Sequence, residues 1–306
     1  MGVMRYLWQW SLRVVWKLIE GLKIKTFIVD RVSSNTILAK IYSLAVAGIK
    51  TDKPITINNY KMYVAQEGCK GGWIGENILI KGSYEPYTTQ IFKQVLREGM
   101  VAVDVGAHIG YYTLLASSLV GESGQVYAFE PEPQNYKDLQ RNVELNGFKN
   151  IKAYQKAVFS HAGKLPLYMG IHSGMHSLFK VKDTTEKTVM VDMVSLDDIL
   201  GRRKVDLVKV DTQGAELDVL IGMRKVIKHN KDLKLIIEFQ PNLEHDNSLR
   251  EYWRELATGF GFIYIIDEGR GNIEIANYNY VFEFCKKKRI EGLNLLCATQ
   301  PFGKPL

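Results

Sequence analysis

Short apolar runs alternate with amphipathic segments along residues 100–285, and this alternation predicts strands that alternate with helices. The predicted strands are 101–105, 125–129, 151–156 (ending at Ala157-Val158), 205–210, 233–239, 262–266 and 278–285. The predicted helices are 88–97, 111–119, 134–146, a short one from Ser195, one that runs to about residue 229, and 248–258. Such an order calls for a parallel sheet covered by helices on both faces, with ligands at the carboxyl ends of the strands.

Other segments depart from this alternation. Residues 165–169 and 188–194 predict an antiparallel insertion around the polar loop 170–187, and residues 56–64 predict a hairpin. The predicted organisation is a helical N-terminal extension (1–50), a cap or substrate-side segment (51–99), a central sheet domain (100–285) and a C-terminal tail (286–306).

Residues 1–29 are apolar but interrupted by charges. On a helix, Arg5, Arg13 and Lys17 fall on one narrow polar stripe, and apolar residues cover most of the remainder. Three tryptophans lie among the basic residues, a composition typical of helices at a membrane interface. The alternative is a helix that packs on the sheet domain or on a second subunit of an oligomer.

Composition sets broad limits on function. The chain has 306 residues, a formal charge of +7 and a sequence pI near 9.0, which suits an anionic partner but also a mildly basic soluble enzyme. Its three cysteines are widely spaced and show no metal-ligand or disulfide pattern, as expected in a reducing compartment. No run of about 18 uncharged apolar residues occurs. We expect a cytoplasmic protein, with membrane association left open through residues 1–29.

The turn after the first predicted strand points to a ligand. Residues 104–110 read D-x-G-x-x-x-G, with His108 where a dinucleotide-binding turn would need glycine for close approach to the pyrophosphate. S-adenosylmethionine (SAM) has no phosphate and tolerates a side chain there. Glu130, followed by Pro131, ends the next strand, where a carboxylate can accept both ribose hydroxyls. The combination favours SAM over a dinucleotide.

Over residues 78–242 the chain resembles the FkbM-type methyltransferases, a branch of the class I SAM-dependent enzymes. The motifs that carry the resemblance occur in order and are Tyr84-Glu85-Pro86, Val103–Ala107 with Ile109–Thr113, Phe129-Glu130-Pro131, Asn142 with Leu145-Asn146, Ser177-Leu178, Ser195–Asp198, and Val208–Asp211 with Gly214–Glu216. The chain departs from the family at two positions: His108 stands where Asn is common, and Gln213 where Glu is common.

The resemblance implies a fold and a reaction. The fold is an α/β class I methyltransferase (Rossmann-like) sheet of seven strands, mostly parallel, with the last strand antiparallel. The implied reaction is O-methylation of a hydroxyl on a sugar, glycan or secondary metabolite, with SAM as the cofactor. The predicted cofactor-binding residues are Glu85, Asp104, Gly106, Ala107, His108, Gly110, Tyr111, Glu130, Pro131 and Ala157.

Three side chains are candidates for catalysis. Asp211 and Glu238 should lie at neighbouring strand tips, and Asp211 is the first choice for a general base or for positioning the acceptor. His176, in the polar loop of the insertion with His172, is the third candidate, since histidine titrates near neutral pH. No metal site is predicted, because Gln213 lacks a carboxylate and Gly174 argues against a helix that would align the two histidines.

Other functions remain open at the sequence level. The basic run Lys286–Arg289 suits an RNA methyltransferase, but no RNA-binding module accompanies it, so a nucleic-acid partner is not expected. A SAM-binding, membrane-associated protein without activity is a different class of alternative, and an NAD-dependent oxidoreductase is disfavoured by the glycine spacing.

Overall fold

The computed structural model describes residues 53–64, 78, 82–171, 173–181, 183–241, 246–290 and 292–303. The predicted N-terminal extension, residues 51–52, 65–77 and 79–81 of the cap segment, and His172 lie outside these residues. The chain divides into two compact units, one formed by residues 56–62 and 85–306 and the other by residues 1–55 and 63–84. The first unit contains the sheet domain and nearly all of the described residues, and the account below concerns that unit.

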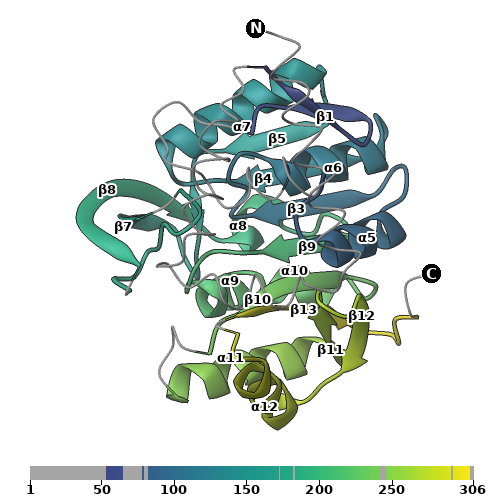
Figure 1. Ribbon diagram of the computed structural model, residues 1–306, viewed down its shortest axis with the longest axis vertical. Coiled ribbons are helices and arrows are strands. Elements are labelled where there is room, and N and C mark those ends of the chain that lie inside the picture. Colours follow the sequence, from purple (N-terminus) through teal and green to yellow (C-terminus); the bar gives the residue numbers. More distant parts are fainter. Residues whose placement is uncertain are drawn as a thin grey trace, which may run out of the picture. The chain divides into compact units, whose positions relative to one another are not determined.

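The central sheet has eight strands in the order β12-β11-β13-β10-β9-β3-β4-β5 (Figure 1). Their bounds are β3 Val101–Val105, β4 Gln125–Phe129, β5 Ile151–Tyr154, β9 Leu207–Val210, β10 Lys234–Phe239, β11 Phe262–Asp267, β12 Asn272–Ile275 and β13 Leu293–Ala298. Strands β5, β4, β3, β9 and β10 are mutually parallel, whereas β13 is antiparallel to both β10 and β11. This is the predicted mostly parallel class I sheet with an antiparallel strand, extended by β12 at one edge.

The antiparallel strand is not the one that the sequence pattern predicted. Residues 278–285 form part of helix α12 (Tyr278–Lys288), because the side chain of Asn277 accepts the N–H of Tyr280 and caps the helix. Val281, Phe284 and Cys285 are buried at helical spacing. The strand is instead β13, inside the predicted tail 286–306, so the sheet domain continues past residue 285. It also begins before residue 100, since α5 belongs to the same compact unit.

Helices cover both faces of the sheet. Their bounds are α5 Pro86–Val95, α6 Tyr111–Val120, α7 Pro133–Asn146, α8 Leu196–Leu200, α9 Glu216–Gly222, α10 Arg224–His229, α11 Asp246–Gly259 and α12 Tyr278–Lys288. Ala128 packs against Leu139 of α7, whereas the adjacent Phe129 points to the opposite face and joins the core beneath α9 and α11. None of the described helices combines the length and apolar character needed to cross a bilayer.

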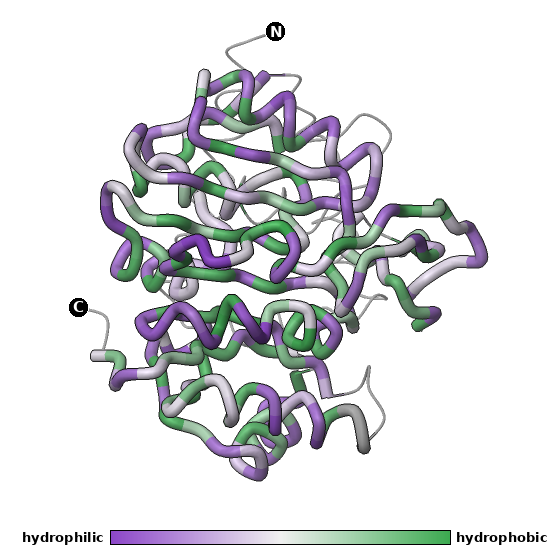
Figure 2. Tube along the Cα trace, turned by 180° about the vertical axis from the view of Figure 1, so that it is seen from behind, coloured by the Kyte–Doolittle hydropathy of each residue, from purple (hydrophilic) through white to green (hydrophobic). Residues whose placement is uncertain are grey.

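Two smaller sheets flank this domain. The predicted hairpin is confirmed as β1 (Ile55–Ile57) and β2 (Tyr60–Met62), and Lys61 and Asn146 of α7 exchange hydrogen bonds of 2.7 Å. The predicted insertion is also confirmed, as β7 (Gly163–Gly170) and β8 (Thr184–Val194). Residues 157–158 do not continue the third strand; they form β6 and pair with β8. Figure 2 shows the β7–β8 hairpin projecting from the sheet with hydrophobic and hydrophilic positions along its length.

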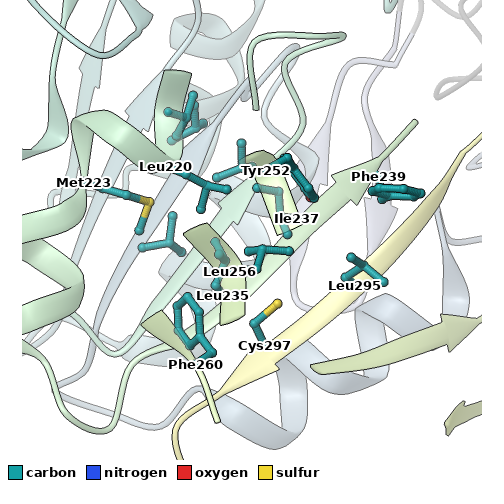
Figure 3. Close-up of a cluster of buried hydrophobic side chains, with 14 of the residues drawn as sticks. Leu220, Met223, Leu235, Ile237, Phe239, Tyr252, Leu256, Phe260, Leu295 and Cys297 are labelled. Carbon is teal, nitrogen blue, oxygen red and sulfur yellow. The ribbon is translucent and has the colours of Figure 1, made fainter. Parts of the chain in front are cut away.

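The main core lies between one face of the sheet and helices α8 to α12. Figure 3 shows its centre, where Leu235 and Ile237 of β10 and Leu295 and Cys297 of β13 meet the helices. Leu295 and Cys297 are fully buried. The predicted single helix after Glu216 is interrupted at Met223, which separates α9 from α10 and inserts its own buried side chain into this core.

Because Leu295 is fully buried between β10 and β11, Leu295→Ala should lower the free energy of unfolding by about 2–5 kcal/mol through lost transfer energy and an incompletely closed cavity. Lys287→Ala, an exposed position of α12, should change it by less than about 0.5 kcal/mol. Urea denaturation measures both values. Equal stability of the two variants would mean that β13 is not an integral part of the sheet.

Candidate active site

The strand register brings the candidate residues to one edge of the sheet. Val105 of β3 stands opposite Phe129 of β4 on one side and Val210 of β9 on the other, and Val210 stands opposite Ile237 of β10. The residues that follow these positions are Gly106, Glu130, Asp211 and Glu238. The register therefore places the glycine turn between Glu130 on one side and the two acids Asp211 and Glu238 on the other.

The glycine turn is shaped by its contact with the loop after β9. Gly106 has φ +81°, and a Cβ atom there would lie 1.8 Å from the main-chain oxygen of Asp211, so no side chain fits. Gly110 has φ +96°, and a Cβ atom there would lie 2.6 Å from Cδ1 of Leu139. The N–H groups of Gly106 and Ala107 both donate to the oxygen of Phe129 at 3.0 Å, which anchors the turn to β4.

Glu130 lies beside this turn, as predicted. Its side chain is buried and accepts the N–H of His108 at 2.8 Å through Oε2 and the N–H of Glu132 at 3.0 Å through Oε1. Burial raises the pKa of Glu130 to about 7, although these hydrogen bonds oppose the rise. The carboxyl group thus shapes the turn and titrates near neutral pH.

His108 occupies the centre of the turn with φ +50°. Its Nε2 lies 3.1 Å from Oγ of Ser173, which belongs to the loop between β7 and β8. Among the residues that the structure describes, its buried Nδ1 has no hydrogen-bond partner. Burial lowers the pKa of His108 to about 4, so the ring is neutral at physiological pH. Nδ1 is therefore a buried polar atom that a ligand in the turn can satisfy.

A buried lysine lies on the α6 face of the same strands. Lys209 stands opposite Asp104 in the register of β3 and β9, and its Nζ is 2.9 Å from Oδ2 of Asp211 and 4.8 Å from the ring centre of Tyr112. Burial alone would lower the pKa of Lys209, but the charges of Asp211 and Glu85 outweigh it and raise the pKa. The ammonium group is thus the positive centre of an acidic cluster.

The other two acids of this cluster are the predicted Asp104 and Glu85. Asp104 accepts the hydroxyl of Thr113 at 2.6 Å, and Glu85 accepts the hydroxyl of Tyr112 at 2.6 Å. Burial raises the pKa of both carboxyl groups. Both predicted residues therefore lie near Lys209, on the side of the sheet that α6 covers.

Asp211 and Glu238 form a linked pair through the amide of Gln213. Nε2 of Gln213 donates to Oδ1 of Asp211 at 3.1 Å and to Oε2 of Glu238 at 2.9 Å. Although burial would raise it, Lys209 and the surrounding hydrogen bonds hold the pKa of Asp211 below its usual range. Burial and the charges of Asp211 and Glu216 raise the pKa of Glu238 well above its usual range. The surroundings thus shift the pKa values of these two adjacent carboxyl groups in opposite directions.

The second acid after β9, Glu216, is hydrogen-bonded within the loop itself. Its Oε1 accepts the N–H and the hydroxyl of Thr212, both at 2.9 Å, and its Oε2 accepts the N–H of Gly214 at 2.9 Å. From the opposite side, the buried hydroxyl of Ser177 donates to the main-chain oxygen of Gln213 at 2.6 Å. The loop that carries Asp211 is therefore braced by α9 and by the insertion.

Other predicted site residues have different surroundings. His176 accepts the N–H of Gly170 through Nδ1 at 2.9 Å, which closes the end of β7, and burial lowers its pKa. Tyr111 packs between α5 and α6, where its hydroxyl lies 3.1 Å from that of Thr89. Ala157 packs in the apolar cluster of the three-stranded sheet. Pro131 is half-buried directly after Glu130.

Sequence reasoning missed the two amides near the acid pair. The sequence marks Gln213 only as a departure from the family pattern that lacks a carboxylate, and it does not single out Gln240, whose Nε2 lies 3.4 Å from Oε1 of Gln213. The sequence indicates these two glutamines only weakly: each lies two residues after one of the acids Asp211 and Glu238. In the described part of the chain, no group of three or more His, Cys, Asp or Glu side chains is arranged to hold a metal ion.

The chain is similar in sequence to several curated methyltransferases. Methyltransferase 1 of Beauveria bassiana is 31% identical over 143 residues, which is 40% of this chain and 57% of that protein. Methyltransferase sdnD of Sordaria araneosa is 32% identical over 154 residues (40% and 59%), and hexuronic acid methyltransferase AglP of Haloferax volcanii is 27% identical over 136 residues (43% and 53%). The chain thus spans little more than half the length of these curated relatives.

Among solved structures, fibrillarin of Aeropyrum pernix with natively bound SAM has 14% identity, 70% coverage of this chain, 74% coverage of that chain and a TM-score of 0.38. A model of the methyltransferase FkbM domain matches residues 104–264, more than half of the chain. The match includes the glycine turn, Glu130 and the pair Asp211–Glu238. The chain therefore belongs to the FkbM methyltransferase family, and its cofactor is SAM.

Proposed function

We propose that this protein is a SAM-dependent O-methyltransferase that acts on a hydroxyl group of a sugar, glycan or secondary metabolite. The observation that carries the proposal is the main-chain contact between Gly106 and Asp211, which joins the cofactor turn to the Asp211–Glu238 pair. Family membership supports the transfer of a methyl group. The naming of one relative as a hexuronic acid methyltransferase supports a sugar acceptor.

The residues around the turn fit the cofactor. Glu130 would accept the ribose hydroxyls, and the unpartnered Nδ1 of His108 would satisfy a polar group of the ligand beside it. The acidic cluster of Asp104 and Glu85 would attract the cofactor's ammonium group, with Lys209 preventing an excess of negative charge. When bound, the cofactor supplies an electrophilic methyl group on a sulfonium, which is already a good leaving group.

Because the sulfonium is a good leaving group, the protein has to align the acceptor oxygen and remove one proton. Glu238 is better suited to receive that proton than Asp211, the first choice from the sequence. In its ionised form, Glu238 is the stronger base of the pair because its pKa is raised, whereas Lys209 keeps the pKa of Asp211 low. Asp211 would instead accept a hydrogen bond from the acceptor hydroxyl and hold it in place.

Glu130→Gln should weaken SAM binding roughly tenfold to a hundredfold, because a hydrogen bond to a charged group contributes about 1.5–3 kcal/mol. Glu144→Gln, an exposed position of α7, should bind SAM as the wild type does. Isothermal titration calorimetry near pH 8 gives both affinities. If Glu130→Gln bound SAM as tightly as the wild type, the proposal that Glu130 accepts the ribose hydroxyls of SAM would be wrong.

SAM affinity should decrease up to about tenfold when the pH is lowered from about 8 to about 6. Glu130 has a pKa of about 7, so it loses its charge over this interval, and a neutral carboxyl group is a weaker acceptor. His108, with a pKa of about 4, stays neutral throughout. Calorimetry across the pH range should show a flat profile for Glu130→Gln; a wild-type profile that is equally flat would contradict the assignment.

Glu238→Gln should lower turnover by roughly a hundredfold or more, the usual contribution of a general base, while SAM affinity stays near the wild-type value. Glu283→Gln, on the exposed side of α12, should leave turnover unchanged. The assay follows labelled methyl from SAM into uronic acids, hydroxylated polyketides and bulk RNA. Methyl transfer to RNA alone would exclude the small-molecule proposal, and full turnover by Glu238→Gln would exclude Glu238 as the base.

A further inference from the structure

We propose that Gln213 is the positioning residue of the acid pair: its side-chain amide holds Asp211 and Glu238 together by donating one N–H to each. None of the relatives or motifs described above assigns this role to an amide at position 213. The inference rests on the proposed function where it makes the pair act on the acceptor. The hydrogen-bonded unit itself is defined by geometry alone.

The side chain of Gln213 uses all its polar atoms in this arrangement. Nε2 lies 3.1 Å from Oδ1 of Asp211 and 2.9 Å from Oε2 of Glu238, and an amide nitrogen carries two hydrogens, one for each acceptor. Oε1 lies 3.4 Å from Nε2 of Gln240. A glutamate of the same shape would replace the double donor with a third carboxylate.

The main chain at Gln213 is held in a costly conformation. Its φ of +56° lies in the left-handed region, which residues other than glycine seldom adopt. Ser177 binds the main-chain oxygen of Gln213, and Glu216 binds the N–H groups of Thr212 and Gly214 on either side. These hydrogen bonds hold the main chain of residues 212–214 in the conformation that directs the side-chain amide of Gln213 toward the two acids.

The chemical effect follows from the charges around the pair. Two neighbouring carboxylates repel each other, and hydrogen-bond donors to the ionised forms oppose that repulsion and lower both pKa values. Gln213 is a neutral donor to both, so it opposes this repulsion without adding charge, and the amide of Gln240 also lowers the pKa of Glu238. The other titratable groups that interact electrostatically with the pair are Lys209 of β9, Asp104 of β3, Glu85 before α5, Glu216 of α9 and His108 of the glycine turn.

The test is a direct titration of Glu238 in protein labelled with ¹³C at the glutamate carboxyl groups. The carboxyl signal that is missing from Glu238→Gln identifies the residue. Gln213→Met keeps the size of the side chain and removes both donors, so it should raise the apparent pKa of this signal by about one unit or more. Gln213→Glu keeps the shape and adds a carboxylate, and it should raise the pKa at least as far.

The matched control is Gln134→Met, which removes a 3.3 Å bond from a glutamine to Asp138 on the exposed side of α7. It should leave the Glu238 titration unchanged. Near-ultraviolet circular dichroism verifies the fold of each variant, and Gln213→Glu gives the answer if Gln213→Met does not fold. An unchanged titration in the Gln213 variants, or an equal shift in Gln134→Met, would overturn the proposal.

No acceptor substrate enters this experiment, so its result is independent of the proposed function. A shifted titration in an enzyme that methylates none of the candidate acceptors would preserve the role of Gln213 and reject the proposed chemistry. Methyl transfer to an acceptor together with an unshifted titration would support the proposed function and reject the role of Gln213.

Discussion

The contact between the main chains of Gly106 and Asp211 is the constraint on which this site depends. Two parallel strands, β3 and β9, end side by side, and their following residues approach so closely that a Cβ atom at Gly106 would overlap the oxygen of Asp211. The contact sets the distance between the glycine turn and the acids Asp211 and Glu238. Under the proposed function, it would hold the cofactor and the acceptor hydroxyl in alignment.

The electrostatic design depends on one ammonium group. Lys209 is almost fully buried, and such a charge is tolerated only where opposite charges compensate for its lost hydration. It bonds directly to Asp211 and not to Glu238, so its field is felt unequally by two neighbouring acids. Both groups are carboxyl groups, so their different pKa values arise from their surroundings: the pKa of Asp211 is lowered and that of Glu238 is raised.

The residues that sequence reasoning placed correctly are those fixed by local pattern. Strand ends and glycine spacing predict Gly106, Glu130, Asp211 and Glu238 at one edge of the sheet, because parallel strands in register bring their carboxyl ends together. The failure at α12 arose because Tyr278, Tyr280, Phe282 and Phe284 alternate as in a strand, and the cap at Asn277 outweighs that pattern. The bridge made by Gln213 depends on contacts between residues up to 36 positions apart, which no local window contains.

The position of β13 affects how the protein is made on the ribosome. This strand lies between β10 and β11, yet it is synthesised after both of them and after α12. Until it emerges, β10 and β11 each carry an unpaired edge, and the apolar side chains that face α11 lack their partners from β13. The glycine turn and Glu130 depend only on earlier strands and can form first. The strand that bears Glu238, β10, therefore gains its second hydrogen-bonded neighbour only after β13 has been synthesised.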